Sequence, residues 1–255
     1  MRPVTLCFSG LDPSGGAGLQ ADIEAIAVLG GHAAVVCTAL TVQDSQRVYG
    51  FEAVSPELIR QQAEAVLADL PVAAVKLGML GSGAIAAVIA DLLAVHPAIP
   101  VVLDPVLAAN SGGNLANDDL AQGLFRLFAR ATVITPNSVE ARRLSGENDL
   151  DKAVASLQAK GARHVLLKGG HEPGNTICNQ LYGPAGLISE SQWPRLPGEY
   201  HGSGCTLASA LAAGLAAGLS LPAAVNAAES FVAQALQRAD RHRDEGQFLP
   251  VRIPS

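Results

Sequence analysis

The sequence is 255 residues long, 49% hydrophobic and 16% charged, with a formal net charge of −6. This length is ordinary for a single α/β domain, and the apolar content is enough to bury a large core. A chain with this charge offers no basic face to a phosphate backbone, so nucleic acid is not an expected partner. The 4 cysteines show no C-x-x-C spacing and no accompanying histidine cluster, which argues against a disulfide framework and against a zinc site.

Neither residues 1–9 nor the interior of the sequence indicates export or a membrane span. Residues 1–9 contain one arginine followed by a strand-like run, without the cleavage pattern of a signal peptide. No stretch of about 18 residues is continuously apolar without glycine or charge, as a membrane span requires. We therefore expect a cytoplasmic protein without a membrane partner, and we expect residues 1–255 to form a single domain.

Strand-like and helix-like segments alternate along the chain. In chain order the pattern predicts a strand at 4–9, a helix at 17–29, a strand at 35–40, a helix at 56–70, a strand at 73–77, a helix at 82–95, a strand at 101–103, a helix at 118–129, a strand at 132–135, a helix at 151–159, a strand at 164–167, and helices at 204–218 and 222–242. Apolar residues recur with helical spacing in the helices, and Ser55 followed by Pro56 is typical of a helix start. Residues 169–200 are rich in glycine and proline, and we expect loops and a short hairpin there.

Unbroken apolar strands that alternate with helices predict a mainly parallel central sheet covered by helices on both faces, a three-layer α/β/α architecture. Ligands bind such sheets outside the carboxyl ends of the strands. Polar and glycine residues follow five of the predicted strands, in the segments 9–18, 78–81, 104–106, 136–140 and 168–171. One such loop is ordinary, but five at one edge of a sheet favour a binding site.

The sharpest local feature is the segment His201-Gly-Ser-Gly-Cys-Thr206, directly before an alanine-rich helix. A glycine-rich turn that runs into a helix presents several backbone N–H groups to one anion. The segment lacks the Gly-Lys-Ser/Thr ending of a Walker A loop and the third glycine of a dinucleotide fingerprint. A thiol at Cys205 should have a lowered pKa there and could accept a proton from a substrate hydroxyl. The alternative is an ordinary turn before a core helix with a buried cysteine.

Seven segments together resemble the hydroxymethylpyrimidine/phosphomethylpyrimidine kinases of thiamin synthesis, within the ribokinase-like superfamily. They run in order along nearly the whole chain: Ser9 to Asp22, Thr38 to Gln43, Lys76 to Leu80, Asp104 to Val106, Thr135 to Asn137, Lys168 to His171, and Gly202 to Thr206. Most ribokinase-like kinases have aspartate where this chain has Cys205. A cysteine at that place is similar to the pyrimidine kinases and to a related group of pyridoxal kinases.

The resemblance implies an ATP- and Mg²⁺-dependent kinase for a small molecule, and it suggests a homodimer. It assigns the anion hole for the transferred phosphoryl group, with Cys205 as base or as positioning group for the substrate hydroxyl, to Gly202, Ser203, Gly204 and Cys205. It assigns the wall of the pyrimidine pocket to Gly10, Asp22, Gln43 and Met79. Phosphoryl transfer depends on alignment and charge neutralisation more than on covalent chemistry, and these residue types supply both.

The resemblance also implies a nucleotide and metal site. Lys168 would contact the ATP phosphates, Asp104 would lie near the phosphates and the metal, and Asn137 with Glu140 would organise Mg²⁺ through water and phosphate. Each residue has a simpler interpretation: Glu140 could only favour a helix dipole, and Lys168 could only reach solvent. The sequence departs from the family at Ser138-Val139 and after the Lys168 loop, where residues 178–182 offer no acidic side chain. Contacts to adenine in residues 172–200 are therefore not assigned.

The expected reaction is phosphorylation of 4-amino-5-hydroxymethyl-2-methylpyrimidine to its monophosphate and then to the diphosphate. The alternative in the same class is a pyridoxal or pyridoxine kinase. A non-catalytic ligand-binding relative is disfavoured because Lys168, Gly202, Gly204 and Cys205 are all present. A Rossmann-type oxidoreductase is disfavoured because the early G-x-G-x-x-G is missing.

Overall fold

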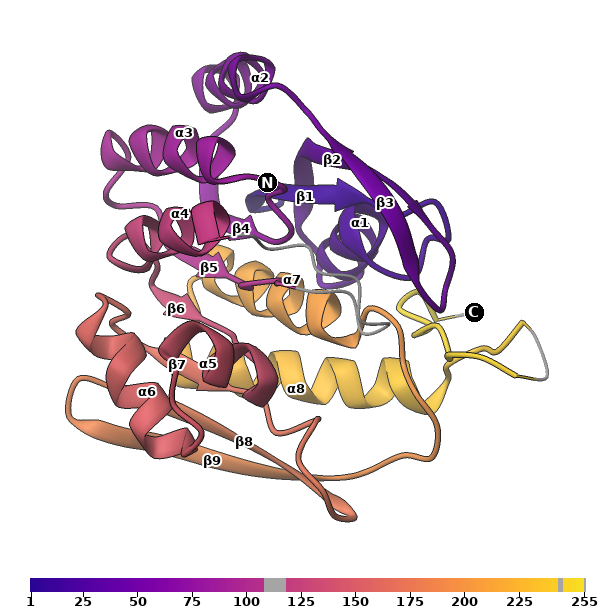
Figure 1. Ribbon diagram of the computed structural model, residues 1–255. Helices are drawn as coiled ribbons and strands as arrows, with labels where there is room; N and C mark the ends of the chain where they lie inside the picture. Colours follow the sequence, from indigo (N-terminus) through magenta and orange to yellow (C-terminus); the bar gives the residue numbers. More distant parts are fainter. Residues whose placement is uncertain (108–117, 243–244, 255) are drawn as a thin grey trace.

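The computed structural model describes residues 1–107, 118–242 and 245–254. A central sheet is covered by helices on both faces, as Figure 1 shows. The described strands are β1 (Val4–Leu11), β2 (His32–Gln43), β3 (Val48–Ala53), β4 (Val72–Leu77), β5 (Val101–Leu103), β6 (Val133–Ile134), β7 (Val165–Leu167), β8 (Thr176–Gly183) and β9 (Gly186–Pro194). The described helices are α1 (Gly18–Val28), α2 (Pro56–Asp69), α3 (Gly83–Ala94), α4 (Asp118–Phe128), α5 (Ser138–Ser145), α6 (Leu150–Ala159), α7 (Ser203–Ala216) and α8 (Leu221–Gln237).

The nine strands of this sheet are ordered β3-β2-β1-β4-β5-β6-β7-β8-β9. All pairs from β2 across to β7 are parallel, and β3, β8 and β9 add antiparallel strands at the two edges. The predicted three-layer fold with a mainly parallel sheet is confirmed. The chain leaves β1 toward β2 on one side and returns to β4 on the other, and this switch point is where such sheets bind ligands.

Alternate residues of the central strands pack into two hydrophobic cores, one on each face of the sheet. In β5, Val101 and Leu103 pack into the larger core, while Val102 packs into the smaller one. The larger core lies under α2 to α6, and the smaller one lies under α1, α7 and α8 (Figure 1). Successive side chains of a strand point to opposite sides, so an unbroken apolar run is what a sheet covered on both faces requires.

The helix starts follow ordinary capping chemistry. Ser55 Oγ accepts a hydrogen bond from the Leu58 N–H, and Pro56 occupies the first turn of α2, as predicted. Asn137 and Glu140 form a reciprocal capping box at the start of α5. Glu140 therefore has a structural role in the helix start, whatever else it does.

The structure departs from the predicted elements at both sheet edges. The strand β3 was not predicted, because its sequence contains Gly50 and lacks an apolar run. It pairs with β2 alone, at one edge of the sheet. Residues 176–194 form two long strands in place of the expected loops and short hairpin. β9 is mostly exposed, and both strands mix polar with apolar residues, so neither shows the unbroken apolar run by which the central strands were found. The last helix also ends at Gln237, five residues before the predicted limit at His242.

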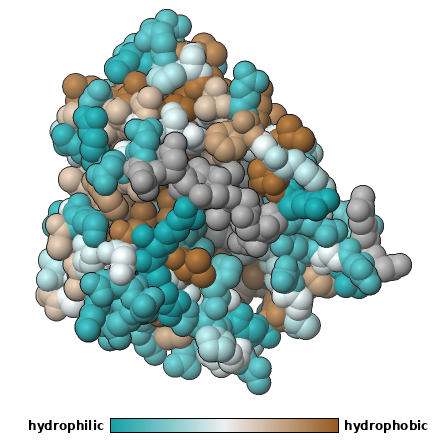
Figure 2. All heavy atoms as spheres, in the orientation of Figure 1, coloured by the Kyte–Doolittle hydropathy of each residue, from teal (hydrophilic) through white to brown (hydrophobic). Residues whose placement is uncertain are grey.

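No helix within the described part of the chain is both long and apolar enough to span a bilayer. The face drawn in Figure 2 is largely hydrophilic, with scattered hydrophobic residues.

Candidate active site

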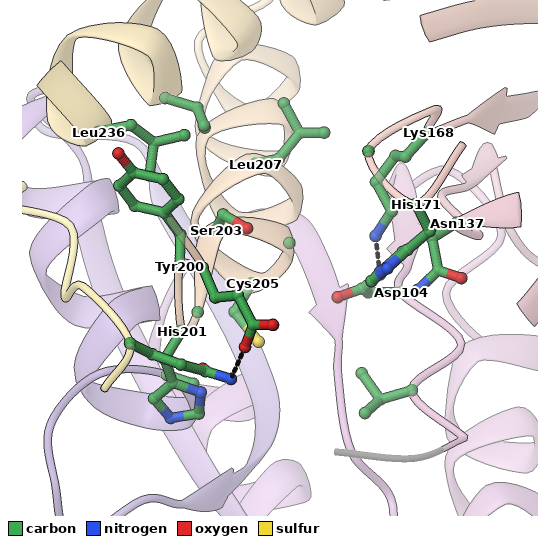
Figure 3. A pocket seen from close by; sticks show the side chains of 18 of the residues that line it. Asp104, Asn137, Lys168, His171, Tyr200, His201, Ser203, Cys205, Leu207 and Leu236 are labelled. Carbon is green, nitrogen blue, oxygen red and sulfur yellow. Dashed lines mark hydrogen bonds and ion pairs between the residues drawn. The ribbon is translucent and has the colours of Figure 1, made fainter. Parts of the chain in front are cut away.

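A single cavity of about 680 Å³ opens at the carboxyl ends of the parallel strands. It is bordered by the ends of β1, β4, β5, β6 and β7 and by the start of α7. All the predicted site residues except Asp22 line it. Figure 3 shows its two sides: Lys168, Asp104, Asn137 and His171 lie opposite Ser203, Cys205, Tyr200 and His201. The structure thus brings together residues that are nearly two hundred positions apart in the sequence.

The start of α7 has the shape of an anion-binding turn. Gly202 adopts a positive φ of 84°, and a Cβ there would collide with the Gly16 carbonyl oxygen. Only glycine fits both constraints. Thr206 Oγ1 donates to the Gly202 carbonyl oxygen at 2.8 Å, and this hydrogen bond holds the turn against the first turn of α7. The N–H groups at a helix start carry partial positive charge, so this turn can hold a phosphoryl group.

Gly204 faces the cation on the opposite side of the cavity. A Cβ built on Gly204 would lie 3.3 Å from Lys168 Nζ and 3.9 Å from Asp104 Oδ2. The glycine therefore leaves open the space between the α7 turn and the lysine. An anion placed there would contact backbone N–H groups on one side and an ammonium group on the other.

Lys168 and Asp104 form an ion pair with an Nζ–Oδ1 distance of 2.8 Å, drawn as a dashed line in Figure 3. Thr135 Oγ1 also donates to the Asp104 carboxylate, at 3.0 Å. Burial alone would lower the pKa of Lys168, but Asp104 and Glu140 outweigh it and raise the pKa above its usual value. Lys168 is therefore a cation at neutral pH, with its charge directed into the cavity.

Glu140 is nearly buried and lies in the same group of charges. Burial raises its pKa to about 7; Lys168 opposes this shift and Asp104 adds to it. Its Oε2 accepts from the Asn137 N–H at 2.8 Å, and Asn137 Oδ1 accepts from the Glu140 N–H at 2.8 Å. The capping box thus fixes both side chains at the cavity edge.

The other side of the cavity is formed by β1, by β2 and by Met79, the second residue after β4. A Cβ on Gly10 would lie 3.2 Å from Met79 Sδ, so glycine permits the close approach of these two residues. Gln43 lies at the end of β2, and its Nε2 is 3.5 Å from His201 Nε2. A primary amide, a thioether and exposed backbone make a wall suited to a flat polar ring.

His201 and Asp12 join the turn before α7 to the loop after β1. His201 Nε2 lies 2.7 Å from Asp12 Oδ2, and Asp12 also accepts from the backbone N–H groups of Ser14 and Ala17 at 2.8 Å. Burial would raise the pKa of Asp12, but hydrogen bonds from His201 and Ser14 lower it to about 2. Asp12 was not predicted as a site residue, because an aspartate beside proline and glycine is equally typical of a turn.

Asp22 does not line the cavity, which corrects its assignment to the pyrimidine pocket. Its side chain is fully buried, with Oδ1 2.8 Å from Lys76 Nζ. It is the fifth residue of α1, and Ser209 Oγ of α7 also donates to its Oδ1, so the carboxylate is enclosed between α1, β4 and α7.

The pKa of Cys205 corrects a second prediction. The Gly18 N–H at the start of α1 hydrogen-bonds its sulfur, and Cys205 lies in the first turn of α7, as expected for a low-pKa thiol. Burial nevertheless raises the pKa above its usual value, and Asp104 and Asp22 add to the increase while Lys76 opposes it. The loss of water around the sulfur raises the pKa by more than the N–H groups at the two helix starts lower it. The thiol is therefore protonated at neutral pH in this structure.

The sequence matches the family described as Phosphomethylpyrimidine kinase over residues 12–250. The chain belongs to this family. It is 42% identical over 244 residues to a hydroxymethylpyrimidine/phosphomethylpyrimidine kinase of Streptomyces coelicolor, an alignment that covers 92% of this chain and 88% of the relative. Some curated relatives are longer, multifunctional proteins, and the chain spans 50% of one from Geobacter sulfurreducens.

The structure of this chain is similar to solved structures of two kinds of kinase. The phosphomethylpyrimidine kinase of Clostridium difficile has a TM-score of 0.79 at 32% identity, covering 92% of this chain and 100% of that one. A pyridoxal kinase of Staphylococcus aureus in complex with AMP-PCP and pyridoxal has a TM-score of 0.86 at 30% identity, covering 99% and 94%. The ribokinase-like resemblance is confirmed, and the comparisons support a phosphotransferase.

Proposed function

We propose that this protein transfers the γ-phosphoryl group of ATP to the hydroxymethyl group of 4-amino-5-hydroxymethyl-2-methylpyrimidine, and then phosphorylates the monophosphate. The observation that carries the proposal is the gap between the α7 turn and the Lys168–Asp104 pair, which Gly204 leaves open. An anion in that gap is held from both sides, and family membership indicates which anion it is. The cavity lies at the carboxyl ends of five strands, which is where this class of fold binds its ligands.

ATP use is supported by the structures of the Staphylococcus aureus pyridoxal kinase in complex with ADP and with AMP-PCP. In this chain the phosphates would lie between Lys168 and the N–H groups of Gly204 and Cys205. Leu207 and Leu236 line the same cavity, on α7 and α8, and an apolar wall of this kind suits a nucleotide base. The donor would therefore extend from the turn toward α8.

The residues present fit Mg²⁺ held indirectly. Among the described residues, no group of three histidine, cysteine, aspartate or glutamate side chains could hold a metal alone. Asp104 is close enough to Glu140 to raise its pKa, so these two side chains would place negative charge beside a cation bound with the phosphates. Mg²⁺ commonly keeps several waters and binds through one or two carboxylates plus phosphate. When bound, it would neutralise charge on the phosphates.

Pyridoxal kinase is a second candidate, because pyridoxal kinases are among the similar solved structures at TM-scores up to 0.88. The wall formed by Gln43 favours the pyrimidine. A primary amide has one acceptor and two donors, which match the amino group and ring nitrogen of an aminopyrimidine edge. Pyridoxal offers a phenol and an aldehyde on the corresponding side, a poorer match.

One assay tests the function. Purified protein is given Mg·ATP with the pyrimidine alcohol, its monophosphate or pyridoxal, and ADP release is followed. We expect turnover with both pyrimidine compounds and a lower kcat/KM for pyridoxal. ADP release with none of the three would contradict the proposed function, and a preference for pyridoxal would establish the second candidate.

A homodimer is also proposed, on the exposed face of β2. Two large apolar residues two positions apart, and therefore on one side of the strand, stand out there: Leu40 is 50% exposed and Val42 65%. Hydrophobic surface also lies over the β2–β3 region in Figure 2. Contiguous apolar residues on an otherwise polar surface mark interaction sites. Sedimentation at micromolar concentration should give a dimer that Val42→Glu converts to monomer; a monomeric wild type would contradict this.

A further inference from the structure

A buried ion pair lies beneath the cavity floor. Lys76 Nζ is 2.8 Å from Asp22 Oδ1, and both side chains are 0% exposed. Lys76 Nζ also donates to Ser9 Oγ at 2.8 Å, and Ser209 Oγ donates to Asp22 Oδ1 at 2.5 Å. These four side chains, the Lys76 network, come from β1, α1, β4 and α7.

Fold stability does not account for this network. Removing two charges from water costs about as much as their attraction returns, and well-packed apolar pairs often replace buried ion pairs without loss of stability. The other carboxylate oxygen, Asp22 Oδ2, is buried and has no hydrogen-bond partner within the described part of the chain. Such an unsatisfied atom is destabilising. A network that costs stability yet lies against the cavity suggests a functional role.

The network extends to Cys205 from two directions. Ser209 is four residues after Cys205 in α7, so the two side chains lie on the same face of the helix. Ser9, at the other end, lines the cavity together with Cys205. A Cβ on Gly78 would lie 2.6 Å from Lys76 Nζ, so the glycine after β4 makes room for the ammonium group close to the cavity.

We propose that Lys76 is a positioning residue for phosphoryl transfer, whose buried positive charge stabilises the Cys205 thiolate that accepts the substrate proton. The inference rests on the proposed kinase function and deepens it. Four charged groups influence the sulfur: Lys76 from β4, Asp22 from α1, Asp104 after β5 and Lys168 after β7. Lys76 makes the largest of the contributions that favour the thiolate, and the Gly18 N–H adds to it.

In the step itself the hydroxymethyl O–H bond breaks and its proton goes to Cys205 Sγ. The alcohol oxygen forms a bond to the γ-phosphorus of ATP. The bond from that phosphorus to the β,γ-bridging oxygen breaks, and the electron pair leaves with ADP. Because burial raises the pKa of the thiol, the fraction of thiolate limits the rate at neutral pH, and Lys76 increases that fraction. Asp22 keeps Lys76 protonated in the core, and its own negative charge partly offsets the effect.

The test measures the thiol directly, without substrate. The rate at which iodoacetamide alkylates Cys205 is followed against pH by mass spectrometry of the peptide that contains it. Removing Lys76 alone leaves Asp22 as an unpaired buried charge, so the main variant is the double substitution Lys76→Met/Asp22→Asn, whose folding is checked by circular dichroism. Ser209→Ala is the control, because it breaks one hydrogen bond of the network without altering any charge.

We expect the double variant to raise the apparent thiol pKa by about one unit, since one unit is a tenfold change in thiolate fraction. Ser209→Ala should leave it unchanged. At pH 7.5 kcat of the double variant should fall about tenfold with an unaltered KM for ATP, and the deficit should shrink as pH rises. A purely structural role predicts a loss that does not depend on pH. An unchanged thiol pKa in the double variant, or an equal shift in Ser209→Ala, would overturn the proposal, whereas absence of kinase activity in the wild type would refute only the proposed function.

Discussion

Lys168 shows how much one side chain contributes to the proposed site. Its ammonium pairs with Asp104 and faces the space that Gly204 leaves open. We expect Lys168→Ala to raise the KM for ATP and to lower kcat, each about tenfold or more, because a charge-assisted hydrogen bond contributes about 1.5–3 kcal/mol in ground and transition states. Steady-state kinetics check this, with Lys152→Ala as a control at an exposed lysine on α6. Values within twofold of wild type would mean that Lys168 does not contact the nucleotide.

The prediction at Gly204 concerns the addition of a side chain, whereas the one at Lys168 concerns the removal of one. A Cβ there lies 3.3 Å from Lys168 Nζ, in the space assigned to the phosphoryl group. Gly204→Val should therefore displace the phosphoryl group from its backbone N–H donors and lower kcat a hundredfold or more while the protein stays folded. Loss of one such donor in an anion hole typically costs about a hundredfold or more in kcat. Gly50→Val in β3 is the matched control, since nothing lies within 4 Å of a Cβ at that glycine. Near-normal turnover of a folded Gly204→Val would exclude the α7 turn as the anion site.

The residues that the sequence misassigned differ from the others in their surroundings. Glycines and Lys168 could be placed because the strand ends fix where the backbone goes. Asp22 could not, since its side chain is buried against Lys76, a partner 54 positions away in the sequence. The pKa of Cys205 depends on how much water is excluded around the sulfur, and this follows from packing that no local pattern encodes.

Among the elements, the C-terminal segment after α8 supports the anion site in a way the sequence did not reveal. Arg252 is 2% exposed, and it donates to Thr206 Oγ1 at 2.8 Å, to Glu24 at 3.0 Å and to the Gly16 carbonyl. Thr206 and Gly16 both border Gly202, whose conformation makes the turn. An arginine near a chain end carries no local signal of such a role.

The segment should therefore affect both stability and catalysis. Arg252→Met leaves Glu24 and two oxygens without their donor, so we expect a loss of about 3 kcal/mol in the free energy of unfolding. We also expect kcat to fall about tenfold as the α7 turn loosens. Urea unfolding and steady-state kinetics measure the two effects, with the exposed Arg163→Met as control. A variant that is destabilised but keeps wild-type kcat would show that the segment only supports the fold.

At the scale of the whole molecule, alternation of apolar strands with helices was enough to predict the three layers and the edge that carries the site. The central strands were found because burial on both faces makes them apolar throughout. The edge strands β3, β8 and β9 were missed because pairing with one neighbour permits polar and glycine residues. Residues of β8 and β9 also line the cavity, so the sequence left that part of its wall unassigned.

The central claim is that this site phosphorylates a pyrimidine alcohol, and Gln43 tests it most directly. If its amide pairs with the ring edge, Gln43→Leu leaves that edge unsatisfied at a cost of about 1–3 kcal/mol. We predict that wild type prefers the pyrimidine alcohol to pyridoxal in kcat/KM, and that Gln43→Leu lowers the value for the pyrimidine about ten- to a hundredfold while that for pyridoxal changes much less. Equal losses on the two substrates would contradict ring reading by Gln43, and a wild type that prefers pyridoxal would contradict the claim itself.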